Sequence, residues 1–325
     1  MRRLRGVLAV LAVGALAACS TPLPVPQPDA EPAATPPALY EEQADRVLAD
    51  LATVVAEADA ALDPSLLDPR VVGPAREIRG VEYLLAGAGD PDAVTAVPEG
   101  SQTLVLPTTD AWPRTFMAVT ESPEDLQAPL LLVLVQDSPR AQYRLWSWAR
   151  LFPGTTMPRT TEPAIGSSPV APDSADLAVP PTDVLAQYVD LLTNRDQSPY
   201  ANAFTPDPLR AAVAQTRDAF VGVVGANGSL TETYTPDAHG LAAIATADGG
   251  AIVVGTIRTV TTISLTDSTM KIGDQTAALL GKDTITSNLE IQWLSVVAFH
   301  VPPAGSTDPI EVLGAEHSRI QAAGQ

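Results

Sequence analysis

The chain has 325 residues, of which 46% are hydrophobic, and this fraction excludes wholesale disorder because it supplies a packed core. Its formal net charge of −19 repels phosphate backbones, so nucleic acid is excluded as a partner. The single cysteine, Cys19, leaves no intramolecular disulfide to stabilise a fold.

The first nineteen residues have the pattern of a bacterial lipoprotein leader. Three arginines precede an apolar run over Gly6–Ala18, which has the length of a signal-peptide core and is too short to span a bilayer. The run ends in the residues Leu-Ala-Ala-Cys, which resemble a lipobox, the motif at which the cysteine is diacylated and the chain is cut before it. The resemblance implies a signal peptide over residues 1–18 and a lipid anchor on Cys19. The alternative is an ordinary secretory signal with an incidental cysteine, although a free thiol outside the cytoplasm is a liability.

A proline-rich stretch follows the anchor. Ser20–Pro37 contain seven prolines and few bulky apolar residues, a composition that forms neither a helix nor a core. We therefore predict that residues 19–37 comprise the lipidated cysteine and an extended tether. At about 3.1 Å per residue, such a tether spans roughly 50 Å.

The next segment, residues 38–152, is predicted to contain helices followed by strands. Apolar residues recur at helical spacing over 38–62, and a shorter helix is predicted over 72–85 after two Asp-Pro breaks. The period then shifts toward two, which predicts four strands. These cover residues 101–107, 114–120, 129–136 and 142–151.

Residues 153–181 contain a further seven prolines and are predicted to be a linker. The segment after it, residues 182–325, repeats the order of elements, with helices predicted over 182–193 and 209–224. The second helix is expected to end near Gly225. Strands are predicted over 241–246, 251–265, 287–300 and 309–320.

The repeated order predicts an α+β fold made of two similar tandem units, each with helices followed by a curved antiparallel sheet of about four strands. The alternative is coincidence, since helices followed by a meander are common. The order of elements resembles the NTF2-like cone fold and, more loosely, cystatin-like folds, which implies a sheet curved over helices with a cavity between. The complete layout also resembles uncharacterised lipoproteins of actinobacteria, a resemblance that implies no particular activity.

One predicted strand carries an unusual alternation of aromatic and cationic residues. Because side chains alternate along a strand, Arg144, Trp146, Trp148 and Arg150 are expected to share one face. Trp and Arg are enriched at interaction hot spots, so this face is a candidate recognition surface for an envelope protein or a glycan. The alternative is that the face packs against the helices or the other domain.

The sequence contains no recognisable catalytic motif. The three histidines are far apart and no cysteine remains after lipidation, so we predict no metal site and no cofactor. Acid–base chemistry in a cone-shaped cavity would have to use residues that are scattered along the sequence. The alternative is that these residues are ordinary solvated groups on the surface. The candidates are Asp218, Glu232, Tyr234, Glu290 and His300.

These observations predict a non-catalytic, membrane-anchored protein that faces outward from the cell and binds or scaffolds a partner at the envelope. Its expected partners are the lipid bilayer, through the acyl chains on Cys19, and an envelope protein or glycan. The alternative is an envelope enzyme or small-ligand binder that uses a cavity in one of the α+β units.

Overall fold

The structure, a computed structural model, describes residues 35–122 and 127–325. Two helices come first in this part of the chain. The leader, Cys19 and nearly all of the predicted tether lie outside the described residues. Helix α1 (Glu41–Ala61) buries one stripe, and α2 (Gly73–Gly87) has a proline in its first turn, where the missing N–H costs nothing. Both helices begin and end within three residues of their predicted bounds.

The strands and the remaining helices follow in the predicted order, with additions in the second half. The short 3₁₀ helices η1 (Pro64–Leu67), η2 (Pro91–Ala93), η3 (Arg195–Gln197) and η4 (Gly225–Asn227) connect the longer elements. The first half continues with β1 (Ser101–Val105), β2 (Arg114–Thr120), β3 (Leu130–Gln136) and β4 (Arg144–Leu151). The second half comprises α3 (Pro181–Asn194), α4 (Pro208–Val224), β5 (Gly228–Ala245), β6 (Ala251–Leu265), β7 (Met270–Lys271), α5 (Asp274–Leu280), β8 (Thr284–Ile285), β9 (Asn288–Val301) and β10 (Glu311–Gly324).

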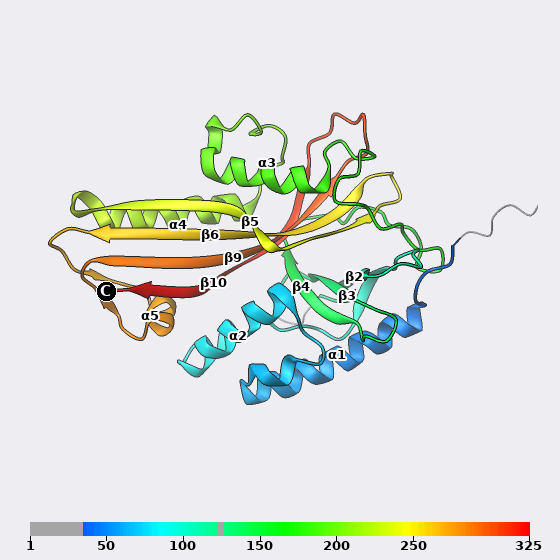
Figure 1. Ribbon diagram of the computed structural model, residues 1–325, viewed down its shortest axis with the longest axis horizontal. Coiled ribbons are helices and arrows are strands. Elements are labelled where there is room, and N and C mark those ends of the chain that lie inside the picture. Colours follow the sequence, from blue (N-terminus) through cyan, green and yellow to red (C-terminus); the bar gives the residue numbers. More distant parts are fainter. Residues whose placement is uncertain (1–34, 123–126) are drawn as a thin grey trace, which may run out of the picture. The chain divides into compact units, whose positions relative to one another are not determined.

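Eight of the strands form one curled antiparallel sheet in the order β1-β2-β3-β4-β10-β9-β6-β5 (Figure 1). Strand β4 meets β10 through only two residue pairs, Gly314 with Leu151 and Ala315 with Arg150. A Cβ atom on Gly314 would lie 2.4 Å from the carbonyl oxygen of Arg150, so this close crossing requires glycine. The strands of the two halves thus join at a short seam, which we call the β4–β10 seam.

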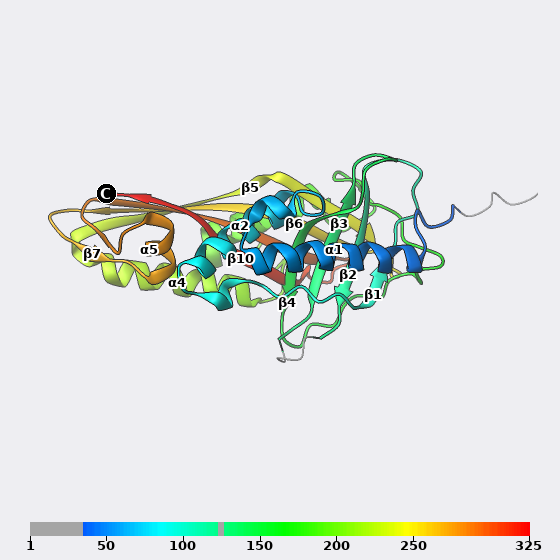
Figure 2. The ribbon, with the colours of Figure 1, turned by 90° about the horizontal axis from the view of Figure 1, so that it is seen from below.

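Helices cover both faces of the long strands. Side chains of α3 and α4 pack on one face of the long strands, and α1 and α2 share a core with the other face. Figure 1 shows α3 beside β5, and Figure 2 shows α4 and α5 on the same side of the far end of these strands. Alternate residues of β6 enter different cores: Ile252 and Val254 join the core of α1 and α2, while Val253 and Ile257 join that of α3. The first of these cores therefore contains side chains from both halves of the chain.

The α+β class is confirmed, but the structure does not show two tandem units. The order helix, 3₁₀ helix, helix, 3₁₀ helix and strands occurs in both halves, yet their strands share one sheet and one of the cores. An NTF2-like fold is not confirmed. The segment predicted as a linker is tied to both ends of the sheet by isolated bridges at Ser167, Pro169 and Leu177.

Candidate functional site

The predicted Arg–Trp face of β4 is divided by a β-bulge. The ladder pairs Leu134 with Leu145 and Val133 with Ser147, so Trp146 is an extra residue in its strand. An extra residue reverses the alternation. Arg144 therefore lies on the face opposite Trp148 and Arg150, which corrects the expectation that all four share one face.

The two tryptophans of β4 pack against α2. Trp148 is fully buried, and the guanidinium of Arg79 lies 5.2 Å from its ring centroid. Trp146 is half-buried against the start of the helix, where a Cβ atom on Gly73 would come within 2.7 Å of the indole. Gly73 has φ +57°, a backbone conformation that favours glycine as well. These contacts support the packing interpretation of the face.

The two arginines of this strand make separate contacts. Arg144 forms an ion pair with Asp137 in the β3–β4 turn, and Nη1 of Arg150 donates to the carbonyl of Ala128 at 3.0 Å. A recognition role for Arg144, Trp146, Trp148 and Arg150 stays a prediction, although these residues do not form one face and Trp148 is buried.

Of the five candidate acid–base residues, the structure brings Glu232 and Tyr234 into contact and places Glu290 and His300 elsewhere. Glu232 accepts a hydrogen bond of 2.8 Å from Tyr234 and lies 3.3 Å from Nη1 of Arg217. Its partner on β6 is Thr261, whereas Glu290 pairs with Thr262, so the two carboxylates lie on opposite faces of the sheet.

Asp218 is linked to Tyr234 only through Arg195, and His300 lies far from both. The Asp218 side chain is exposed, with Arg195 at 4.0 Å, and His300 lies 3.3 Å from Asp248. His300 pairs with Ile252 of β6, nine positions along that strand from Thr261, which corresponds to roughly 30 Å. The five candidates do not form one acid–base site.

A buried charge network that the sequence did not reveal lies beneath α2. Arg79 is 1% exposed, and its Nη1 lies 3.0 Å from Glu82 and donates to the carbonyl of Thr95 at 2.7 Å. The Thr95 hydroxyl donates to the other oxygen of Glu82 at 2.6 Å, and Asp59 lies 3.7 Å from Nε of Arg79. Burial raises the pKa of Glu82 from 4.5 to about 7, against the opposing effect of Arg79.

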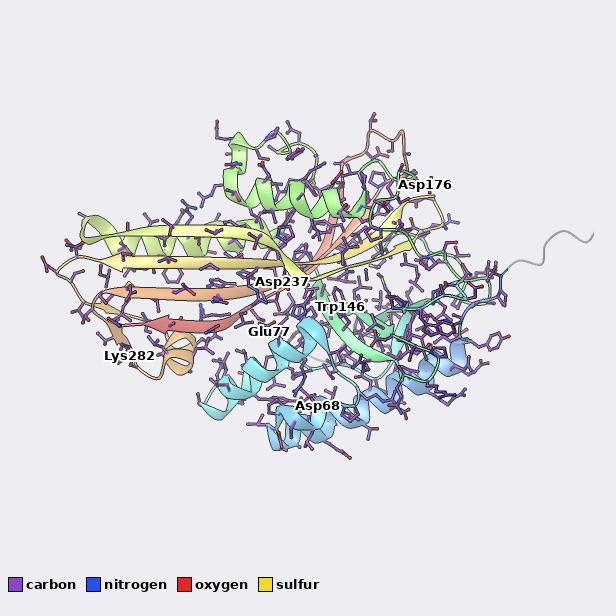
Figure 3. The ribbon with its side chains drawn as sticks, viewed as in Figure 1. Asp68, Glu77, Trp146, Asp176, Asp237 and Lys282 are labelled. Carbon is purple, nitrogen blue, oxygen red and sulfur yellow. The ribbon has the colours of Figure 1, made fainter. Side chains whose placement is uncertain are left out.

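A second charge cluster joins α2 to the far half of the sheet. Arg258 of β6 donates to Glu77 of α2 at 2.9 Å and to Asp237 of β5 at 2.8 Å, and His239 lies 3.1 Å from Glu77. Glu77, Asp237 and Trp146 lie near one another where α2 meets the sheet (Figure 3). Asp237 lies in the interruption of the β5–β6 ladder between Pro236 and Leu241. The cluster therefore fastens α2 to an irregular edge strand.

One histidine is held neutral beside an indole. The rings of His317 and Trp293 are parallel with centroids 4.8 Å apart, Arg319 lies 4.4 Å from the same indole, and Ser295 lies 2.8 Å from Nδ1 of His317. Burial, with a smaller effect of Arg319, lowers the pKa of His317 from 6.5 to about 4. An uncharged ring suits this stacked position.

Glu82 and His317 are expected to give opposing pH dependences of stability. Between pH 4.5 and 7 folded Glu82 retains a proton that the unfolded chain has lost, so its contribution falls as pH rises. Folded His317 excludes a proton that the unfolded chain binds below pH 6.5, so its contribution rises with pH from about 4 to 6.5.

Substitution of either residue should expose the pH dependence of the other. In Glu82→Gln the free energy of unfolding should rise by about 2 kcal/mol between pH 4.5 and 6.5, and in His317→Phe it should fall by about as much. Urea titrations across this range measure both slopes. Equal slopes in the wild type and both variants would contradict the assignment.

Two surface hollows meet at β1, one at the free edge of this strand and one that crosses from it over β2 toward the end of β4. One, of about 340 Å³, is lined by β1 residues, by Glu41 and Asp45 of α1, and by Thr160–Pro163. A second, of about 280 Å³, shares Gln102 and Thr103 with the first and continues past Val119 of β2 and Leu151 of β4 to Phe152 and Met157. We call the two together the β1-edge groove.

Two further properties concern metals and membranes. Among residues 35–122 and 127–325, no three His, Cys, Asp or Glu side chains are grouped so as to hold a metal ion. Within the same ranges, no helix combines the length and apolar character that a membrane span requires.

Comparison with known proteins identifies relatives of the chain. The family described as "Domain of unknown function (DUF8094)" matches residues 35–324. A protein of Streptomyces avermitilis described as an uncharacterized lipoprotein is 29% identical over 222 residues, which cover 67% of this chain and 65% of that protein. The chain thus spans slightly less than two thirds of this relative's length. No solved structure matches the chain.

Proposed function

The chain belongs to the DUF8094 family, and on that premise we propose that it is a lipid-anchored protein of the cell envelope that binds or scaffolds a partner. The observation that carries the anchor is the lipobox-like sequence ending at Cys19, together with the lipoprotein that the chain resembles. Two acyl chains bind a bilayer stably where one binds marginally, because each buried methylene contributes about 0.8 kcal/mol. The anchored domain faces outward from the cell.

A binding role is supported by how the candidate catalytic residues are placed. Glu232 and Glu290 lie on opposite faces of the sheet, and His300 lies far along it, so these groups do not converge on a substrate. The alternative, an enzyme or small-ligand binder with a cavity inside one unit, needs such convergence. The β1-edge groove begins at the edge of the sheet and is lined by none of these five candidates.

We also infer that the two halves arose by duplication of one unit of helices and about four strands, in the general order of NTF2-like domains. The support is the repeated succession α1-η1-α2-η2 and α3-η3-α4-η4, each followed by strands of the common sheet. On this inference, β7, α5 and β8 are an insertion in the second copy.

Replacement of the anchoring thiol tests the proposal. In a Cys19→Ser variant, which lacks the thiol that is acylated, incorporation of an alkyne-labelled palmitate should fall to background. The mature protein should also move from the detergent phase to the aqueous phase in a Triton X-114 partition. Ser20→Ala is the matched control, because it alters the neighbouring residue and keeps the thiol. Full labelling of Cys19→Ser would overturn the anchor.

A further inference from the structure

One edge of the eight-stranded sheet is only partly covered. Strand β1 is the first in the sheet order, so it has a strand neighbour on one side only. The chain after β4 returns along the free side, where the N–H of Ser167 donates to Leu106 at 2.8 Å and the N–H of Thr108 donates to Ser167 at 2.9 Å. This is a parallel bridge, and it lies just beyond the end of β1.

Before Ser167, the returning segment lies away from the edge. The N–H groups of Ile165 and Gly166 both donate to the carbonyl of Glu162 at 2.9 Å, which closes a turn. In the described part of the chain, no backbone hydrogen bond joins Thr160–Pro163 to Ser101–Val105, and the first hollow of the β1-edge groove lies between them. The groove therefore occupies the place of a missing strand.

The lining of the groove changes from acidic to apolar along its length. Glu41, Asp45 and Glu162 line the first hollow, and none of the three has an ion-pair partner among residues 35–122 and 127–325. The second hollow is bordered by Phe152, Met157 and other apolar residues. An occupant complementary to this lining is cationic at one end and apolar at the other.

The free edge determines the conformation of the occupant. In an antiparallel pair, alternate residues direct their N–H and C=O groups away from the partner, so β1 presents such groups to the groove. An extended peptide satisfies them by adding a strand, a recognised mode of peptide binding. The chain's own residues 20–34 are poorly suited, because they contain five prolines, which lack N–H donors, and two acidic residues but no Lys or Arg.

We propose that the β1-edge groove binds an extended basic segment of a partner protein as an added strand. The cationic residues of that segment pair with β1 beside Glu41, Asp45 and Glu162. Its apolar end leaves the added strand and lies in the second hollow, against Phe152 and Met157. This inference rests on the binding role proposed above and names its surface and partner class. The palmitate-labelling experiment tests the lipid anchor, whereas peptide binding is measured in detergent and needs no membrane. A failure of the anchor and a failure of peptide binding are therefore distinguishable.

The test uses the purified full-length protein in dodecyl maltoside and a fluorescent peptide of sequence RTRTVTV. Saturable binding is expected from fluorescence anisotropy at low salt, and the charge-reversed peptide ETETVTV should bind at least about tenfold more weakly. A version of RTRTVTV with alternate amides N-methylated keeps the charge but loses strand hydrogen bonds, so it should also bind more weakly. Hydrogen exchange at Ser101–Val105 should slow when the unmodified peptide is bound.

Variants of the protein locate the site. The double variant Asp45→Asn/Glu162→Gln should bind RTRTVTV about fivefold more weakly, since each exposed ion pair contributes modestly. Glu42→Gln/Glu57→Gln is the matched control, because it removes two exposed acids of α1 that do not line the groove. The proposal is overturned by absence of saturable binding, by equal loss in the control variant, or by equal binding of the N-methylated peptide. Tighter binding after deletion of residues 22–32 would instead identify the tether as the occupant.

Discussion

Replacing Arg79 with methionine is expected to lower the free energy of unfolding at pH 8 by about 3–5 kcal/mol, because it leaves a buried carboxylate without its counter-charge. Arg79 is 1% exposed and contacts Glu82, Asp59 and the carbonyl of Thr95. Its guanidinium also lies beside the ring of Trp148, so the substitution removes a stacking contact as well. Urea-induced unfolding followed by tryptophan fluorescence measures the loss.

Two comparisons separate the buried charge from simple loss of packing. At pH 5, where Glu82 is largely protonated, the loss should be smaller than at pH 8, since no carboxylate at that position is then left charged. Arg79→Met/Glu82→Met should recover part of the loss, because an apolar pair replaces a buried ion pair at little cost. Arg76→Met is the matched control: its partner Asp68 is exposed, and the cost should stay below about 1 kcal/mol. A loss independent of pH in Arg79→Met would contradict this account.

Gly314→Val is expected to cost about 3 kcal/mol, because the added side chain must push apart backbone atoms at the β4–β10 seam. Its Cβ atom would lie 2.4 Å from the carbonyl oxygen of Arg150 and 2.8 Å from Cα of Leu151. Neither atom can move without moving β4. Since only two residue pairs form the seam, the substitution should also speed hydrogen exchange of Ala315 and Leu151 more than that of β2 and β3.

The control for this prediction is a glycine with free space around it. Gly222 lies within α4, and among the described residues no atom outside the local helix backbone comes within 4 Å of where its Cβ would lie. Gly222→Ala should therefore raise stability by roughly 0.5–1 kcal/mol. Thermal unfolding of the two variants beside the wild type gives the comparison. If Gly314→Val were as stable as the wild type, β4 and β10 could separate further at the seam without loss of stability, and the prediction would be wrong.

Local patterns in the sequence predicted most elements but not their pairing. The predicted bounds of β2 and β6 agree with the structure to the residue, because their apolar runs end at clear turn residues. The first half of β5 was missed: Ser229, Thr231 and Thr233 are exposed on an edge strand, so little apolar alternation marks it. The pairing of β4 with β10 joins residues over 160 positions apart, and no local pattern encodes it.

The candidate site was less predictable than the fold. Arg79 and Glu82 look like an ordinary helical ion pair in the sequence, and their burial depends on Trp148 and Thr95, which come from other elements. The bulge at Trp146 likewise arises from register against β3, so strict alternation placed Arg144 on the wrong face. The β1-edge groove depends on how the segment before Ser167 leaves the sheet, which proline content alone does not specify.

The β4–β10 seam also has a consequence for the order in which the chain can fold. The partner of β4 is β10, which comes last in the chain among the strands of this sheet, so the first half must wait for residues 314 and 315 before its sheet acquires that neighbour. Contacts of such long sequence separation slow folding, because a long loop must close before they form. During synthesis the N-terminal strands would remain incomplete for most of the chain's length, and a chaperone that holds extended segments would be of most use in that interval.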